Sequence, residues 1–193
     1  ELDEDGLAPM EGSIHREKTA MTRAGLSVPF QLLVRYGYIN MKSTFLDYGC
    51  GQGGDVKAAL AMGVPAHGYD PHFNPITAQP SDIVALSFVL NVIEDPAERV
   101  EVLHKAFSLA GRVLAVGFLN SAEGDAFGDG VKTSIGTFQK IFSPREAQEY
   151  LTEHLEAQFC WLGQNTAFVF ADEEAVRDFQ CRRSLDKLQL SER

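Results

Sequence analysis

A glycine-rich turn between an apolar run and a helix-forming run constrains the fold of this chain more than any other feature. The stretch "FLDYGCGQGGD", residues 45–55, holds four glycines after a short apolar run. Glycine adopts positive φ readily and lets the backbone approach a ligand where a Cβ would clash. A strand, a glycine turn and a helix in this order are typical of α/β folds, which bind ligands at the carboxyl end of a parallel sheet.

Strand and helix signals alternate along the rest of the chain. This alternation predicts a Rossmann-like, mostly parallel sheet covered by helices on both faces and ended by an antiparallel hairpin. Only eleven residues separate Asp70 from Asp82, so we expect the sheet to be trimmed around its third strand. A glycine-rich segment, residues 120–136, is long enough to be a mobile lid. The predicted strands are 43–49, 66–70, 82–88, 112–118, 157–163 and 166–172, and the predicted helices are 27–39, 53–63, 96–110, 143–155 and a charged one from 172.

The glycine turn fits two ligand-binding patterns. Gly49, Gly51 and Gly54 match the G-x-G-x-x-G of dinucleotide sites. Asp47, Gly49, Gly51 and Gly53 match the acid-x-G-x-G-x-G of S-adenosylmethionine enzymes. The two patterns make different demands on the residue that precedes the glycines.

Asp47 favours S-adenosylmethionine over a dinucleotide. A carboxylate at this position repels a pyrophosphate, whereas it attracts a ligand with an ammonium and a sulfonium. A second acid, Asp70, ends the next predicted strand, where a carboxylate can accept both ribose hydroxyls. A chain of 193 residues also leaves no room for a second, substrate-bearing dehydrogenase domain.

With these residues the chain resembles the class I methyltransferases from about residue 44 to 171. The stretch "SFVLNVIEDPAERVEVLHKAFSLAGRVLAVGF" is similar to their fourth strand, loop, helix and fifth strand. The resemblance implies that the glycine turn holds the methionine end of S-adenosylmethionine and that Asp70 holds the ribose. It places Asn91 where an amide could orient substrate or cofactor, although an amide cannot act as a base. The implied cofactor-binding residues are Asp47, Tyr48, Gly49, Cys50, Gly51, Asp70, Pro71, Phe88 and Asn91.

A narrower likeness is to the DNA phosphorothioation-associated methyltransferases. Five motifs occur in the same order: "HREKTAMTR", "DYGCGQGGDV", "GYDPHFNP", "VLNVIEDPAERVEVL" and "GTFQKIF". The likeness does not imply a base methyltransferase. No D/N-P-P-Y/F/W and no Pro-Cys follow the predicted fourth strand, so neither the usual grip on an exocyclic base amine nor covalent C5-cytosine chemistry is expected.

Two groups of residues are candidates for binding the methyl acceptor. Residues 13–42 are locally basic in a chain whose net charge is -10, which suggests contact with an anionic or nucleotide-related substrate. The segment "GTFQKIF" offers an aromatic ring, an amide and a cation after the predicted lid. The same charges fit a solvated surface, and the same aromatics fit a lid anchor. The candidates are His15, Arg16, Lys18 and Arg23 in the arm, and Phe138, Gln139 and Lys140 after the lid.

Composition excludes several classes of protein. The net charge of -10 disfavours tight nonspecific binding to nucleic acid. There is no run of about twenty apolar residues and no secretory signal, so we expect no membrane partner. The cysteines, at positions 50, 160 and 181, are too widely spaced for a disulfide framework or a metal-ligand pair, so we expect a cytoplasmic protein without a metal.

We divide the chain into an acidic tail that we expect to be disordered (residues 1–12), an N-terminal arm and helix (13–43) and a methyltransferase domain (44–193). Three functions are compatible with this sequence. The first is an S-adenosylmethionine-dependent methyltransferase, which we favour. The others are a catalytically idle module that binds the same cofactor, and a small dinucleotide-binding protein.

Overall fold

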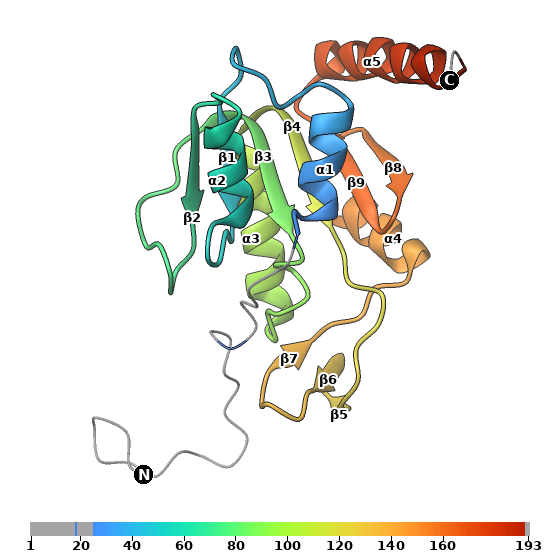
Figure 1. Ribbon diagram of the computed structural model, residues 1–193. Helices are drawn as coiled ribbons and strands as arrows, with labels where there is room; N and C mark the ends of the chain where they lie inside the picture. The colour runs from blue at the N-terminus through green and yellow to red at the C-terminus, as the bar shows by residue number, and fades with distance from the viewer. Residues whose placement is uncertain (1–17, 19–24, 192–193) are drawn as a thin grey trace.

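A six-stranded sheet with the strand order β2-β1-β3-β4-β9-β8 forms the centre of the molecule (Figure 1). The computed structural model describes residue 18 and residues 25–191, so the predicted tail, residues 1–12, lies outside the described part. The strands of this sheet are β1 (Phe45–Tyr48), β2 (Ala66–Tyr69), β3 (Ser81–Ser87), β4 (Ala110–Gly117), β8 (Phe159–Gly163) and β9 (Thr166–Phe170). The helices are α1 (Val28–Arg35), α2 (Gly54–Ala61), α3 (Pro96–Ser108), α4 (Pro144–His154) and α5 (Glu173–Ser191).

The direction of the strands brings four carboxyl ends to one edge of the sheet. β1 pairs in parallel with β2 and β3, and β3 pairs in parallel with β4. β9 runs antiparallel to β4, and β8 antiparallel to β9. The predicted parallel sheet with a closing hairpin is therefore confirmed. β2 is the last strand on its side of the sheet, which also confirms the trimming before Asp82.

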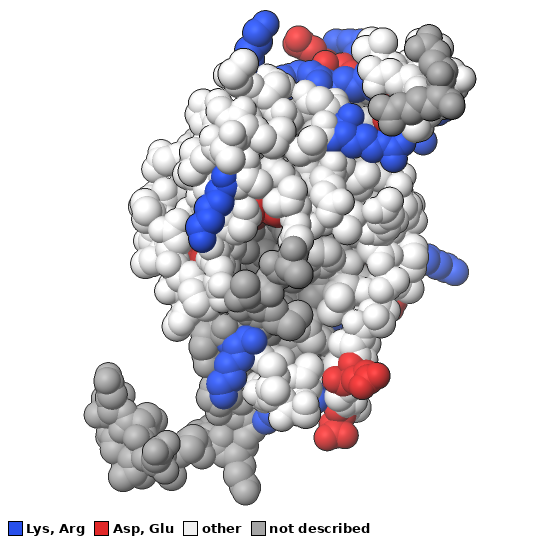
Figure 2. Space-filling model, viewed as in Figure 1, with Lys and Arg blue, Asp and Glu red and all other residues white. Residues whose placement is uncertain are grey.

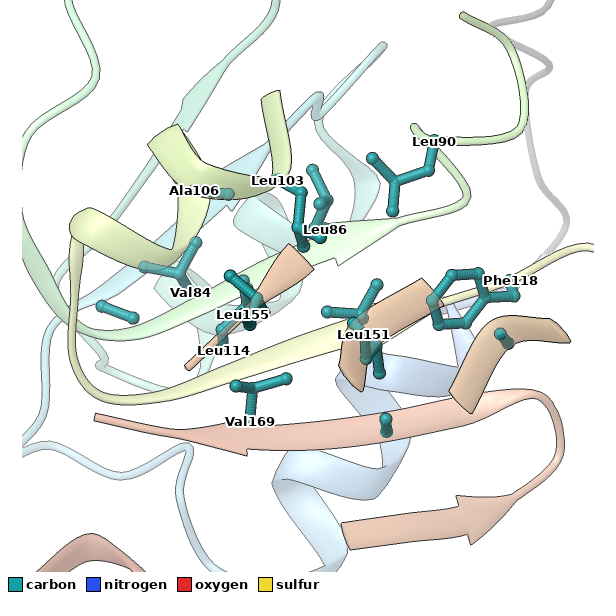
Figure 3. Close-up of a cluster of buried hydrophobic side chains, with 14 of the residues drawn as sticks. Val84, Leu86, Leu90, Leu103, Ala106, Leu114, Phe118, Leu151, Leu155 and Val169 are labelled. Atoms are coloured by element: carbon teal, nitrogen blue, oxygen red, sulfur yellow. The ribbon is translucent and has the colours of Figure 1, made fainter. Parts of the chain in front are cut away.

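Alternating side chains divide the core into two layers. One layer lies between the sheet and α3 with α4, and Leu86, Leu103, Leu114, Leu151 and Val169 belong to it (Figure 3). The other layer lies between the opposite face and helices α1, α2 and α5. Successive residues of a strand point to opposite faces, so the strands are apolar on both sides, as expected for a covered parallel sheet.

Local capping signals fix where three helices begin. Ser27, Asp95 and Ser143 each accept a hydrogen bond from a backbone N–H of the first turn, and each is followed within two positions by proline. Ser143 and Glu146 form a complete capping box. The starts of these helices agree with the prediction. The first helix ends earlier than predicted, at Arg35, because Gly37 has a φ of 70° and turns the chain.

The glycine-rich segment 120–136, which we expect to be a mobile lid, holds secondary structure of its own. It contributes two strands of a second, three-stranded antiparallel sheet made of β5 (Asp125–Phe127), β6 (Gly130–Lys132) and β7 (Phe138–Gln139). Gly128, with a φ of 56°, lies in the turn between β5 and β6. A Cβ on Gly130 would lie 2.4 Å from the backbone oxygen of Gln139, so β7 packs here only against a glycine.

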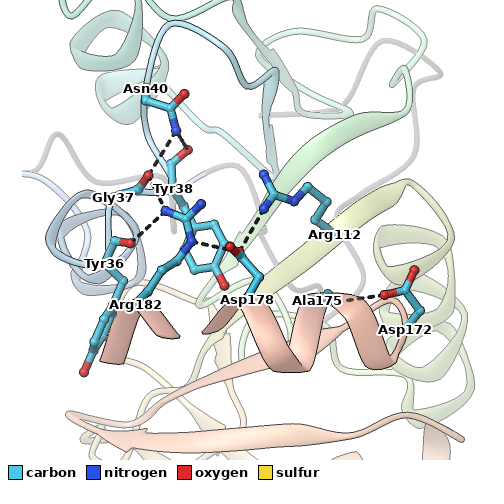
Figure 4. A network of polar contacts seen from close by, with 9 residues as sticks. All are labelled: Tyr36, Gly37, Tyr38, Asn40, Arg112, Asp172, Ala175, Asp178 and Arg182. Carbon is cyan, nitrogen blue, oxygen red and sulfur yellow. Dashed lines mark hydrogen bonds and ion pairs between the residues drawn. The ribbon is translucent and has the colours of Figure 1, made fainter. Parts of the chain in front are cut away.

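Helix α5 is held to the body by aromatic contacts of Phe179 and by ion pairs, and the ion pairs of Asp178 are drawn in Figure 4. Phe179 is buried and its ring contacts those of Tyr36, Phe168 and Phe170. The carboxylate of Asp178 accepts hydrogen bonds from Arg112 and Arg182, each 2.8 Å long. The guanidinium of Arg182 also donates to the backbone oxygens of Tyr36 and Gly37. These contacts all belong to the first half of α5.

Candidate functional site

A cavity of about 630 Å³ opens at the carboxyl ends of the four parallel strands. Its volume is in the range of sites that enclose a ligand of cofactor size. The strand order places the ends of β2 and β4 on opposite sides of the cavity, and the ends of β1 and β3 lie between them. The described lining residues are Gly25, Asp47, Tyr48, Gly49, Cys50, Gly51, Gln52, Gly54, Asp55, Lys57, Tyr69, Asp70, Pro71, His72, Phe73, Ser87, Phe88, Val89, Val92, Ile93, Glu98, Val102, Leu119 and Gln139.

The glycine turn forms the floor of this cavity, and its shape requires glycine. Gly49, Gly51 and Gly53 all have positive φ, a conformation that side chains with a Cβ disfavour. A Cβ on Gly49 would lie 2.3 Å from the side chain of Val89. The backbone N–H groups of Gly49 and Cys50 donate to the oxygen of Tyr69, at 2.7 and 2.9 Å. The turn is thereby fixed against the end of β2.

Asp47 places a buried carboxylate at the start of the turn. Its side chain lies on β1 between Gly68 of β2 and Ala85 of β3, and the residue is 4% exposed. Burial, followed by the charges of Asp47 and Asp70, raises the pKa of the nearby Cys50 thiol to about 12. This end of the cavity therefore disfavours a further negative charge, and it suits a cationic group.

Asp70 ties the loop after β2 to the glycine turn. One carboxylate oxygen accepts the N–H of Gly51 at 3.0 Å, and the other accepts the N–H groups of His72 and Phe73, both at 2.9 Å. A carboxylate offers about four acceptor positions. The three N–H groups therefore leave acceptor capacity for a ligand, and the pairing of Asp70 with both ribose hydroxyls stays a prediction.

Two further predicted cofactor-binding residues, Pro71 after β2 and Phe88 after β3, also line the cavity. Pro71, His72 and Phe73 form its side beyond β2, and the rings of His72 and Phe73 are in edge contact, 4.7 Å between centroids. Phe88 directly follows β3 and has a φ of 64°. An aromatic residue rarely adopts this conformation, and such strain is commonly found at ligand sites.

Asn91 is not placed as predicted and does not line the cavity. Its side chain is fully buried, and its amide nitrogen donates to the backbone oxygens of Leu119 and Lys140. Its amide oxygen accepts the N–H of Leu119 at 2.9 Å. Three backbone groups from distant segments use these donors and acceptors, so Asn91 clamps two loops together and cannot orient a ligand.

The three candidates in "GTFQKIF" have different surroundings in the structure, and only one of them lines the cavity. Phe138 is 1% exposed and packs in the small sheet, with the guanidinium of Arg99 over its ring. Lys140 lies 3.9 Å from Asp129 and stacks on Phe142, and it is not among the described lining residues. Gln139 does line the cavity. The alternative interpretation, a structural anchor, therefore applies to Phe138, and Lys140 lies outside the described lining.

Most of the predicted basic arm cannot be placed. His15, Arg16 and Arg23 lie outside the described residues, and Lys18 is exposed and does not line the cavity. The described chain resumes at the cavity mouth, where Gly25 is part of the lining.

Sequence analysis missed Asp55, a buried acid that follows the glycine turn. It lines the cavity at the start of α2, and its carboxylate accepts the N–H of Ser27 at 3.0 Å. The side chain of Ser27 lies 3.2 Å from that of Ser87. The position of Asp55 directly after the glycines of the turn was the sequence signal that could have identified it. The apolar wall made by Val89, Val92, Ile93, Val102 and Leu119 gave no signal because apolar residues in these positions also predict core.

Two further classes of feature were searched for within the described chain. Residues 18 and 25–191 contain no group of three or more His, Cys, Asp or Glu side chains that could hold a metal ion. None of their helices is long and apolar enough to cross a membrane.

The fold and the position of the cavity define a Rossmann-like class I methyltransferase fold, and solved structures agree. The CcbJ methyltransferase from Streptomyces caelestis matches with a TM-score of 0.51 and 14% identity, over 82% of this chain and 96% of that one. The 1,6-didemethyltoxoflavin-N1-methyltransferase of Burkholderia thailandensis, solved with 1,6-didemethyltoxoflavin and S-adenosylhomocysteine, matches with a TM-score of 0.50 and 14% identity. That match covers 74% of this chain and 75% of the other. No protein-family profile and no curated protein match the sequence.

Proposed function

We propose that the protein is an S-adenosylmethionine-dependent methyltransferase. The observation that carries the proposal is the buried carboxylate of Asp47 at the start of the glycine turn, inside the cavity at the carboxyl ends of the strands. A dinucleotide would bring its pyrophosphate against this carboxylate and be repelled. The ammonium group of S-adenosylmethionine would be attracted. The methyltransferases that share the fold, one of them solved with bound S-adenosylhomocysteine, add support.

The lining residues fit the parts of this cofactor in order along the sheet. Asp47 and the turn at Gly49 and Gly51 suit the methionine end. The remaining acceptor capacity of Asp70 suits ribose hydroxyls, and the aromatic pair His72 and Phe73 suits the adenine. We expect the side of the cavity next to β4 to receive the methyl acceptor, because the other sides are then occupied.

The chemistry requires little beyond positioning. S-adenosylmethionine supplies an electrophilic methyl group, which an acceptor lone pair attacks in line with the breaking S–C bond. The chain's contribution is to hold the acceptor close and aligned and to exclude water. The apolar wall containing Val92, Ile93 and Leu119 can exclude water from the acceptor. We propose a small-molecule or nucleotide-related acceptor, with an anionic group held by the basic arm, and we retain the DNA phosphorothioation association as a hypothesis.

Calorimetry with S-adenosylhomocysteine and with NAD tests the proposal. We expect saturable binding of S-adenosylhomocysteine and none of NAD. Asp47→Asn removes the negative charge with little change in shape, so it should weaken S-adenosylhomocysteine binding at least about tenfold. NAD binding that tightens in the Asp47→Asn variant would instead support a dinucleotide-binding protein.

Turnover distinguishes an enzyme from an idle binding module. The protein should convert methyl-labelled S-adenosylmethionine to S-adenosylhomocysteine when it is incubated with a small-molecule fraction of a cell extract. Binding without turnover in any fraction would support the idle module. The Asp47→Asn protein serves as the control for background turnover by the extract.

A further inference from the structure

Of the predicted acceptor-binding residues that the structure describes, only Gln139 reaches the cavity, and it does so on the side next to β4. Leu119, which follows β4, and Gln139 of β7 both belong to the lining. The end of β2, with Asp70 and its neighbouring aromatics, lies three strands away across the sheet. Neighbouring strands are about 4.8 Å apart, so roughly 14 Å separates the two sides. Gln139 therefore lies away from the part of the cavity assigned to the cofactor.

The chain holds Gln139 in place from both sides. Phe138 before it is buried in the small sheet, and Lys140 after it is bound through its N–H and its oxygen to Asn91. Because adjacent residues of a strand point to opposite faces, burying Phe138 in the small sheet turns the side chain of Gln139 toward the cavity. The clamp made by Asn91 thus positions Gln139.

The amide of Gln139 has hydrogen-bonding capacity that the protein leaves unused. Its Oε1 atom is buried and has no hydrogen-bond partner among residues 18 and 25–191. Tyr38, Ser81 and Tyr150 carry similar atoms, but none of these three residues lines the cavity. A buried acceptor without a partner is unfavourable, and it is commonly retained where a ligand supplies the missing donor.

We propose that Gln139 selects a methyl acceptor whose part inside the cavity is an apolar ring system with one N–H or O–H donor, while any anionic group of the acceptor lies outside this apolar wall. The donor pairs with the amide oxygen, and the apolar body packs against Leu119 and the neighbouring valines. A site built in this way rejects an analogue that lacks the donor, because the buried amide is then left unpaired. The inference rests on the proposed methyltransferase function, and it adds the chemical class of the acceptor.

Matched pairs of small probes test this inference in the full-length protein saturated with S-adenosylhomocysteine. The probes are indole with 1-methylindole, and 2-naphthol with 2-methoxynaphthalene, in which methylation removes the only donor. Ligand-detected NMR should show that the wild type prefers the donor member of each pair by about tenfold. Gln139→Leu should abolish the preference, and Gln139→Glu, which keeps an acceptor, should retain it. Gln148→Leu, the same change at a half-buried position of α4 that does not line the cavity, is the control and should behave as the wild type.

Thermal stability separates this role from a structural one. Gln139→Leu removes an unpaired buried acceptor, so its melting temperature should equal or exceed that of the wild type. A wild type that binds S-adenosylhomocysteine but binds neither member of a pair, or both equally, would overturn the inference. So would a Gln139→Leu protein that melts earlier and keeps the preference. A wild type that does not bind S-adenosylhomocysteine would instead overturn the proposed function.

Discussion

Asp70 shows how one side chain can serve both the fold and the ligand. Its carboxylate accepts three backbone N–H groups, one from the glycine turn and two from the loop after β2. These bonds fix the loop that stands where a larger fold would have a third strand. We expect the acceptor capacity that remains to bind a ligand hydroxyl. Loss of the carboxylate should therefore affect the shape of the site as well as ligand binding.

Asp70→Ala should weaken S-adenosylhomocysteine binding at least about tenfold, because charge-assisted hydrogen bonds contribute about 1.5–3 kcal/mol each. It should also lower the melting temperature. Asp82→Ala is the matched control, since Asp82 accepts two hydrogen bonds from Thr44 at the opposite end of the strands. The control should melt earlier but bind normally in calorimetry. Equal affinity in both variants would contradict the assignment of Asp70 to the ligand.

The Cys50 thiol should be unreactive at neutral pH although it lines the cavity. Burial and the nearby Asp47 and Asp70 raise its pKa to about 12, and the thiolate is the reactive form. At pH 8, iodoacetamide should modify the exposed Cys181 and leave Cys50 unmodified in the folded protein, as read by mass spectrometry. Equal modification of both cysteines would show that the site is open and well solvated.

The raised pKa of Cys50 also makes the free energy of unfolding depend on pH. A cysteine in the unfolded chain ionises near pH 8.5, while the folded protein holds Cys50 protonated up to about 12. The stability linked to this proton is complete below about pH 8.5 and is lost as the pH rises toward the folded value. Urea unfolding at pH 7.5 and pH 9.5 should therefore show a larger loss for the wild type than for Cys50→Ala.

At the scale of elements, a buried arginine ties the small sheet to the main fold. Arg99 of α3 is 2% exposed, and it donates two hydrogen bonds to Asp129, in the turn between β5 and β6, at 2.8 and 3.0 Å. It also donates to the backbone oxygens of Ile93 and Glu94. The hydrogen bonds from Arg99 hold the pKa of Asp129 below its usual value. Residues 120–136 are therefore anchored at their tip.

Asp129→Asn should loosen the small sheet without unfolding the main one. Hydrogen exchange should speed up in residues 124–139 and stay unchanged in the six-stranded sheet. Glu149→Gln, which alters the exposed Arg145–Glu149 pair, should change neither. In the wild type the same region should loosen as the pH falls below about 4, because the contribution of Asp129 is present above its unfolded pKa and is lost through its lowered folded value. Fast exchange of 124–139 in the wild type at pH 7 would restore the mobile-lid interpretation.

The sequence predicted those elements whose signals are local. A serine and a glutamate three residues apart specify the start of α4, and the glycine turn specifies the junction of β1 and α2. The small sheet has no such signal, because its strands of two or three residues are too short to show a period. The role of Asn91 was equally hidden, since its partners Leu119 and Lys140 are 28 and 49 residues away. The sequence also could not show which of the three candidates after the predicted lid lines the cavity. The structure shows that Gln139 does and that Phe138 and Lys140 do not.

At the scale of the whole molecule, one group of positive side chains lies over the helices α1 and α5. Figure 2 shows Lys and Arg side chains crowded at the top of the view, over the region of α1 and α5. Several of them are paired: Arg35 with Asp186, and Arg112 and Arg182 with Asp178. These cations join the C-terminal helix to the body and are largely neutralised there. They give no support to a surface that binds nucleic acid nonspecifically, in line with the net charge of -10.

The buried contacts of α5 lie in its first half, at Ala175 and Phe179, which yields a prediction for the stability of the whole fold. Phe179 is 3% exposed among three aromatic rings, whereas Leu188 of the same helix is 61% exposed. Phe179→Ala leaves a cavity in the core layer shared by α1 and the sheet, and such a change costs about 3–5 kcal/mol. Leu188→Ala removes an apolar side chain from solvent contact and should change the free energy of unfolding by less than about 0.5 kcal/mol. Urea unfolding followed by circular dichroism measures both. A large effect of Leu188→Ala would reveal that its face of α5 is covered in solution, and an intact Phe179→Ala protein would show that α5 is not part of the cooperative fold.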